Sequence, residues 1–146
     1  MIVLGVLLGS CLRSNSGEPK WHKLDAGPYV FSAPEDVVER PLKGRPEDSY
    51  VKEYTGEAVD IMIDYGLYSS SLRDYEMAHS ESIDGRAARL VQYDAAPNGE
   101  FRFTHFRAAY FATTAERKKR LTMYVSCRDA QACRDAEAMF RTVRFR

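Results

Sequence analysis

Apolar and polar residues alternate along several stretches of the chain, and the alternation is clearest over 59–65. There the apolar residues fall at every odd position, whereas Asp60 and Asp64 fall at even ones. A period of two places the apolar side chains on one face of a β-strand and leaves the other face more polar. The segment therefore predicts a half-buried antiparallel strand, which the turn at 55–57 joins to a preceding strand in a hairpin.

Shorter runs of the same kind, separated by glycine, proline and aspartate, predict the other strands. Asp84-Gly85 is the strongest turn signal, because a two-residue hairpin turn favours residues that adopt positive φ. The expected strands are Trp21 to Leu24, Tyr29 to Phe31, Tyr50 to Tyr54, Val59 to Tyr65, Met77 to Ile83, Ala87 to Tyr93, Phe101 to Ala112 and Leu121 to Cys127.

Two segments have helical patterning instead. Pro34-Glu-Asp opens a short helical turn that runs through Val38 and closes before Pro41, since proline and acidic residues favour the first turn of a helix. Near the carboxyl terminus Asp129 can cap a helix in which apolar residues recur at steps of three and four through Val143. We therefore expect an α+β fold, with a single antiparallel sheet of about six strands, a short N-terminal helix and a C-terminal amphipathic helix.

Length and composition limit the class of protein. The 146 residues suffice for one domain, and 45% hydrophobic with 29% charged residues is typical of a folded globular chain. Lys plus Arg number 21, as do Asp plus Glu, so no net positive field attracts nucleic acid. A solvated hairpin turn explains the one dense basic run, Arg117 to Arg120, and a phosphate-binding patch is the alternative.

The amino terminus has the pattern of an export signal. Residues Ile2 to Leu8 are apolar, but the run is far shorter than the roughly 20 residues that cross a bilayer as a helix. The segment Leu8-Gly9-Ser10-Cys11 resembles the lipobox of bacterial lipoprotein precursors, in which the cysteine is acylated and becomes the new amino terminus. Simple signal cleavage and an uncleaved tail on a cytoplasmic protein are the alternatives, because no basic residue precedes the apolar run.

These features divide the chain into three parts. We expect a signal segment with its lipobox cysteine at 1–11, a flexible polar tether at 12–20 and a single domain at 21–146. The resemblance to lipoprotein precursors implies that Cys11 anchors the mature protein to a membrane, on the periplasmic side of a bacterial envelope.

Two further cysteines remain once Cys11 is assigned to lipidation. Cys127 ends an expected strand and Cys133 lies in the first turn of the expected helix. The residues between them suffice to reach the Cα separation of about 5.5 Å that a disulfide needs. We expect a structural disulfide, and the alternatives are two buried free thiols or a metal-binding pair, although no other cysteine or histidine lies at ligand spacing.

The order of the elements has a counterpart in a known family. An aromatic strand ends in Tyr29-Val-Phe-Ser-Ala-Pro34, a central pair of strands ends in Asp64-Tyr65-Gly66, a hairpin contains Ile83-Asp-Gly-Arg-Ala, and a strand and an amphipathic helix follow. This order resembles small PsbP-like proteins of α/β/α fold over residues 21–146. The resemblance implies binding, chaperoning or scaffolding rather than turnover, and it brings no catalytic residues.

Candidate binding residues cluster at the end of the best-defined strand. Asp64, Tyr65, Gly66, Tyr68 and Ser69 combine tyrosines with small polar residues around a flexible glycine. Such a composition suits contact surfaces, because tyrosine gives a large contact area at low entropy cost. A bulge or turn that glycine permits, with Tyr65 in the core, is the simpler explanation.

Catalytic patterns are weak. His22, His79 and His105 lie in three different expected strands without ligand spacing. Asp60 and Asp64 share a strand face but would lie about 13 Å apart along it, too far for an acid/base pair. The chain has neither a glycine-rich phosphate loop nor a serine-hydrolase elbow.

We therefore expect a non-enzymatic, monomeric envelope lipoprotein that uses no cofactor or metal, does not bind nucleic acid, and binds a protein partner or a small envelope ligand. An immunity or inhibitor protein against a secreted toxin is a sharper version of this hypothesis. The alternative is a small periplasmic hydrolase that acts on envelope material. A hydrolase would require a histidine and a carboxylate within hydrogen-bond reach in one concave pocket.

Overall fold

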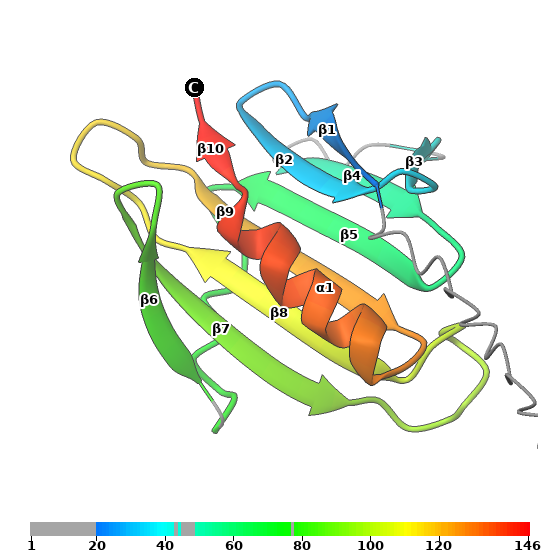
Figure 1. Cartoon of the computed structure of the whole chain (residues 1–146). Helices are drawn as coiled ribbons and strands as arrows, with labels where there is room; N and C mark the ends of the chain where they lie inside the picture. Colours follow the sequence, from blue (N-terminus) through cyan, green and yellow to red (C-terminus); the bar gives the residue numbers. More distant parts are fainter. Residues whose placement is uncertain (1–19, 43, 45–48, 77) are drawn as a thin grey trace, which may run out of the picture.

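The computed structural model describes residues 20–42, 44, 49–76 and 78–146 (Figure 1). The expected lipid anchor at Cys11 and most of the expected tether lie outside the described residues. Within them the elements are β1 (Trp21–Asp25), β2 (Tyr29–Pro34), β3 (Val38–Arg40), β4 (Ser49–Thr55), β5 (Val59–Gly66), β6 (His79–Ile83), β7 (Arg86–Asp94), β8 (His105–Phe111), β9 (Arg120–Cys127), α1 (Ala130–Arg141) and β10 (Arg144–Phe145).

The strands of the described part form two antiparallel sheets. The larger sheet has seven strands in the order β3-β4-β5-β9-β8-β7-β6, and the smaller has three in the order β1-β2-β10. The expected α+β fold, with a single sheet of about six strands between two helices, is therefore wrong, because the described part of the chain is mostly β and α1 is its one helix. It fails partly because β3 and β10 have only three and two residues, too few to show a period of two.

The clearest alternation in the sequence lies in an interior strand of the larger sheet. β5 pairs with β4 on one side and with β9 on the other. Ile61 and Ile63 are 2% and 0% exposed, whereas Met62 between them is 42% exposed. The half-buried strand expected here is confirmed, as is the hairpin at Asp84 and Gly85, where both residues have positive φ.

The inner face of the larger sheet is the one covered by α1 and by the smaller sheet (Figure 1). α1 packs against β8, β9 and β2, and the C-terminal helix is confirmed. The Asp129 side chain caps it by accepting a hydrogen bond of 2.9 Å from the Ala132 amide. The buried residues of the helix are Ala132, Cys133, Ala136, Met139 and Phe140.

The helical turn expected after Pro34 is wrong. β2 runs to Pro34, and a tight turn follows in which the Val37 amide donates to the Pro34 carbonyl at 3.0 Å. The chain then forms β3 against β4, where Lys52 pairs with Glu39 at 3.1 Å. An isolated helical turn is costly to nucleate, and pairing with β4 gives the same backbone groups partners at once.

The end of the chain ties the two sheets together. β10 pairs with β2, and the Arg146 guanidinium meets Asp25 of β1 at 2.7 Å. Phe145 of β10 also covers the buried guanidinium of Arg86 from the larger sheet, whose Cζ lies 3.5 Å from the ring centroid. The smaller sheet is therefore held against the larger one by a strand too short for sequence patterning to reveal.

The outer face of the larger sheet, opposite α1, is partly covered by the 67–76 segment, here called the crossing segment. Its Leu72 is buried against Val91 and Ala108 in a second, smaller core. The Thr122 hydroxyl of β9 donates to a carbonyl of the crossing segment at 2.7 Å. These contacts hold the segment across the sheet. The two ends of the outer face are therefore lined by different residues.

The strand register defines those two ends. Asp60, Ser126 and Phe106 lie in one row across the outer face. Thr122 and Tyr110 lie in another row, further along the same strands, where both contact the crossing segment. The edges of the sheet, β3 and β6, are short and largely exposed.

Candidate functional site

A hollow of about 560 Å³ lies at one end of the outer face, beside the 95–104 loop that joins β7 to β8. We call it the sheet-face hollow. Its volume falls within the range of roughly 300 to 1,000 Å³ that is usual for small-molecule sites. The lining residues used below are Met62, Tyr93, Phe101, Arg102, Phe106 and Tyr124.

A row of aromatic rings forms one wall of this hollow. Tyr75 of the crossing segment lies 4.8 Å from Tyr93, which stacks on Phe106 at 4.9 Å with an angle of 7° between the rings. Phe101 meets Phe106 edge-on, at 5.2 Å and 81°. Phe101 is 45% exposed and Met62 is 42% exposed, so the row continues into an apolar surface that water reaches.

Charged pairs form the rim. The Arg102 guanidinium donates to the Asp60 carboxylate through Nε at 3.0 Å and Nη2 at 2.9 Å, and Nη2 also donates to the Gly56 carbonyl at 2.6 Å. This two-point pairing fixes the 95–104 loop against the β4–β5 hairpin. Arg40 and Glu53 form a second pair at 2.9 Å. The hollow thus has an apolar wall and groups at its rim that can bond a polar substituent.

The tyrosines of the hollow stay neutral. Burial raises the pKa of Tyr93 well above its ordinary value, and the nearby Tyr75 raises it further. Burial also raises the pKa of Tyr124. Both hydroxyls therefore keep their protons at physiological pH and can donate or accept hydrogen bonds.

The structure separates the five binding residues expected at the end of β5. Tyr65 is 9% and Ser69 2% exposed, Gly66 is buried with them, and Tyr68 is 83% exposed. The Ser69 hydroxyl donates to the Asp64 carbonyl at 3.2 Å, so this contact brings Ser69 of the crossing segment to the end of β5. None of the five lines the sheet-face hollow.

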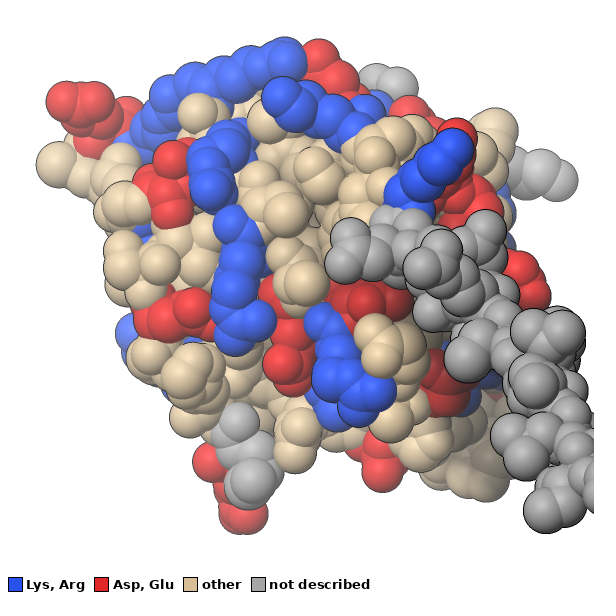
Figure 2. Space-filling view, in the orientation of Figure 1, with Lys and Arg blue, Asp and Glu red and all other residues tan. Residues whose placement is uncertain are grey.

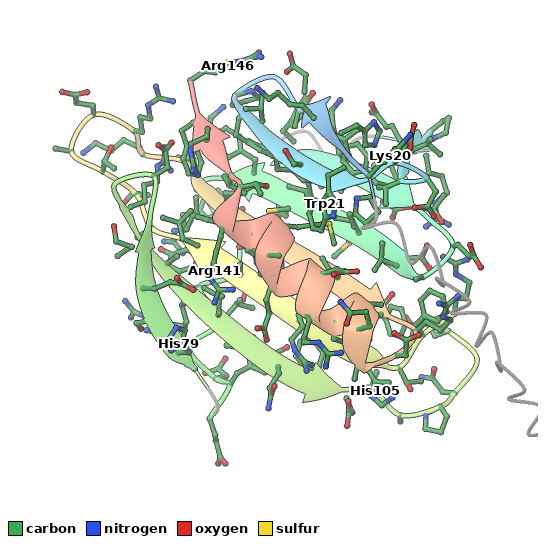
Figure 3. All side chains as sticks on the ribbon, viewed as in Figure 1. Lys20, Trp21, His79, His105, Arg141 and Arg146 are labelled. Atoms are coloured by element: carbon green, nitrogen blue, oxygen red, sulfur yellow. A yellow bond between two sulfur atoms is a disulfide. The ribbon has the colours of Figure 1, made fainter. Side chains whose placement is uncertain are left out.

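The three histidines lie in different surroundings. The Nε2 atom of His22 lies 2.9 Å from a backbone carbonyl, and that of His79 lies 3.7 Å from Glu81. His105 Nδ1 lies 2.8 Å from an Asp94 carboxylate oxygen. Figure 3 shows His79 and His105 well apart on the larger sheet, so the structure does not combine them in one site.

His105 and Asp94 share a second hollow of about 410 Å³ near the start of α1. Arg107, Asp129 and Cys133 also line it. The pairing can orient the imidazole so that Nε2 takes a proton from water. The side chains of His105 and Asp94 are 54% and 72% exposed, so solvent screens the interaction.

Cys127 and Cys133 lie at disulfide distance, with their Cα atoms 5.3 Å apart. Both are buried, and the bond fastens the start of α1 to the end of β9. Across the described part of the chain, no group of three or more His, Cys, Asp or Glu side chains converges as a metal site would require.

The sheet-face hollow could not be predicted from the sequence, because the loop residues that line it alternate as the residues of a strand do. Phe101 and Phe103 alternate with Arg102 and Thr104, which predicts a strand from Phe101 to Ala112. The observed strand β8 begins only at His105. The preceding residues instead form a loop that turns Phe101 and Arg102 toward the outer face.

No family model and no curated protein matches the chain. It is similar to a crystal structure from Bacteroides thetaiotaomicron VPI-5482, with a TM-score of 0.56 and 13% sequence identity over 88% of this chain. The chain spans about half, 48%, of the length of that protein. At this identity the similarity shows a shared fold alone, and it does not bear on the PsbP-like resemblance.

α1 is the one helix among the described residues, and it lacks the length and apolar character needed to cross a membrane.

Proposed function

We propose that this protein is a non-enzymatic binding protein of the bacterial cell envelope, anchored through an acylated Cys11, that takes a small, partly aromatic ligand in the sheet-face hollow. The observation that carries the proposal is the aromatic row, which ends in the exposed Phe101 in a hollow that the exposed Met62 also lines. The envelope location rests on the lipobox resemblance of residues 8–11.

The chemistry of the hollow supports a flat ligand with one polar end. Aromatic faces favour stacked or edge-on contact with another ring, and the thioether of Met62 adapts to varied apolar shapes. Leaving Met62 and Phe101 in water costs free energy that a bound ring would recover. Arg102, Glu53 and the Tyr124 hydroxyl are placed to bond a polar substituent at the rim.

The proposal is tested by NMR titration of the full chain carrying Cys11→Ser, with indole, benzoate and phenylalanine as probes. We expect saturable shifts of the Met62 methyl signal with at least one probe. Phe101→Ala removes the exposed end of the aromatic wall, so it should weaken that binding about tenfold, which is 1.4 kcal/mol and close to the value of burying part of an aromatic ring.

Val38→Ala is the matched control, because Val38 is an exposed apolar residue, 55% accessible, that does not line the hollow. Its affinity for the same probe should equal that of the parent chain. Absence of saturable shifts with all three probes would contradict small-ligand binding in the hollow, as would equal weakening by Val38→Ala and Phe101→Ala.

The pair of His105 and Asp94 supports a second function, hydrolysis of envelope material with His105 as the general base for an attacking water. Release of soluble fragments from purified peptidoglycan would test it. Hydrolysis that is lost in His105→Ala and kept in His79→Ala would favour the enzyme over the binding protein. If the parent chain releases nothing, the enzymatic alternative fails.

A further inference from the structure

A third hollow, of about 430 Å³, lies at the other end of the outer face and has a different character. Arg73, Lys118 and Arg120 line it, and no Asp or Glu does. We call it the basic hollow. The remaining lining residues are Leu67, Ser71, Tyr110 and Thr113, three of which carry hydroxyl groups.

Arg73 is placed by the contacts of the crossing segment. The neighbouring Leu72 is 1% exposed and has φ of 55°, a backbone conformation that a leucine keeps only where its surroundings hold it. The Ser70 carbonyl accepts a hydrogen bond from Thr122 at 2.7 Å. The backbone position of Arg73 on the sheet surface is therefore fixed by its neighbours.

The other two cations are placed by the β8–β9 connection. Its tip closes on itself, because the amide of Thr114 donates to the Arg117 carbonyl at 2.9 Å, and Lys118 follows this turn directly. Arg120 begins β9, and its Nη1 reaches the Ser69 carbonyl of the crossing segment at 3.3 Å. Two segments far apart in the sequence are thus joined at the hollow.

Several cations of the described residues are paired with a carboxylate, whereas those of the basic hollow, like Lys23, Arg89 and Arg134, are not. On the face shown in Figure 2, Lys and Arg side chains are interspersed with acidic ones. Representative pairs join Arg107 to Glu137 at 3.1 Å and Arg141 to Glu81 at 3.0 Å. Arg73, Lys118 and Arg120 form no ion pair with any carboxylate of the described residues.

We propose that the basic hollow binds a phosphate group carried by a second ligand. Gathering three cations without a carboxylate costs repulsion, which an anion of charge near −2 would relieve. Guanidinium groups and hydroxyls match the oxygens of a phosphate in geometry and in donor character. The same chemistry is offered by a soluble phosphate monoester and by the headgroup of an anionic phospholipid.

Titrations of the full chain carrying Cys11→Ser distinguish the two sources. The probes are inorganic phosphate and phosphoserine, followed by NMR, and vesicles of phosphatidylcholine with or without phosphatidic acid, followed by co-sedimentation. Saturable shifts at Thr113 and Lys118 with the soluble probes would assign a soluble phosphate. Binding confined to the phosphatidic acid vesicles would assign a lipid headgroup, and both results support the proposal.

Lys118→Ala should weaken binding of whichever probe binds by about tenfold, since a charge-assisted hydrogen bond is lost. Lys118→Arg should restore most of the affinity. Lys23→Ala, which removes an exposed lysine from β1, is the control and should change nothing.

Two outcomes would overturn the phosphate site. One is the absence of saturable binding to every probe. The other is equal displacement by chloride at matched ionic strength, which would reduce the hollow to a diffuse positive charge. Neither outcome touches the sheet-face hollow, because its test uses other probes and other residues.

Discussion

The position of Asp64 in the fold is unfavourable for its charged carboxylate. Its Oδ1 atom is buried beneath the crossing segment without a hydrogen-bond partner among the described residues. Burial raises the pKa of its carboxyl above the ordinary value, and the neighbouring Ser69 side chain opposes the rise without cancelling it. Asp64, which the sequence predicted as a binding residue, is therefore a group that the fold buries although burial disfavours its charged form.

The pH dependence of stability follows from the sign of this shift. Because the folded-state pKa of Asp64 lies above the unfolded one, its protonated form favours folding below the unfolded pKa, and that contribution is lost as the pH rises through the folded pKa. Asp64→Asn should therefore raise the melting temperature at pH 7. The gain should vanish near pH 3, where the carboxyl is protonated in both states.

Thermal unfolding followed by circular dichroism at both pH values measures this effect. Asp60→Asn is the control on the same face of β5, and it should lower the melting temperature because it weakens the pair with Arg102. A lower melting temperature for Asp64→Asn at pH 7 would show that its carboxylate has a favourable partner after all.

At the scale of elements, α1 depends on its attachment to β9. The bond between Cys127 and Cys133 closes a short loop, so its loss should lower the free energy of unfolding by about 2 kcal/mol. Replacing both cysteines with alanine tests this by urea denaturation. Mass spectrometry of the unreduced protein should also find the two cysteine peptides joined, and alkylation of both in the untreated protein would contradict the bond.

Elements with a strong local period could be predicted from the sequence. β5 and α1 each place one face of a regular element in the core, so the pattern of apolar residues reveals them. The division into two sheets could not be predicted, because β10 is only two residues long and gains its stability from β2, far away in the chain. The same holds for both hollows of the outer face.

The sheet-face hollow shows why a site of this kind could not be predicted from the sequence. Phe101 and Arg102 read as strand residues locally, and only the contacts with Phe106 and Asp60 turn them into the wall and rim of a hollow. Tyr65 and Gly66 lie where the sequence places them, at the end of β5, but burial removes them from solvent. Sequence patterning gives positions along strands, whereas a site depends on which strands are neighbours.

At the scale of the whole molecule, the proposed lipid anchor at Cys11 would decide where the protein acts. Replacing Cys11 with serine should move the full-length protein from the membrane fraction to the supernatant after cell lysis. Its melting temperature should stay the same, because the substitution precedes the described domain. Unchanged sedimentation with membranes would reject lipidation at this residue.

The edge strands of the larger sheet affect how another chain could bind to it. β3 has three residues, all exposed and two of them charged, and β6 bears His79 and Glu81, of which Glu81 is paired with Arg141. Short, charged edge strands disfavour the addition of an incoming peptide as a further strand through backbone hydrogen bonds. These two edges of the larger sheet are consequently poor templates for fibril growth from copies of the chain.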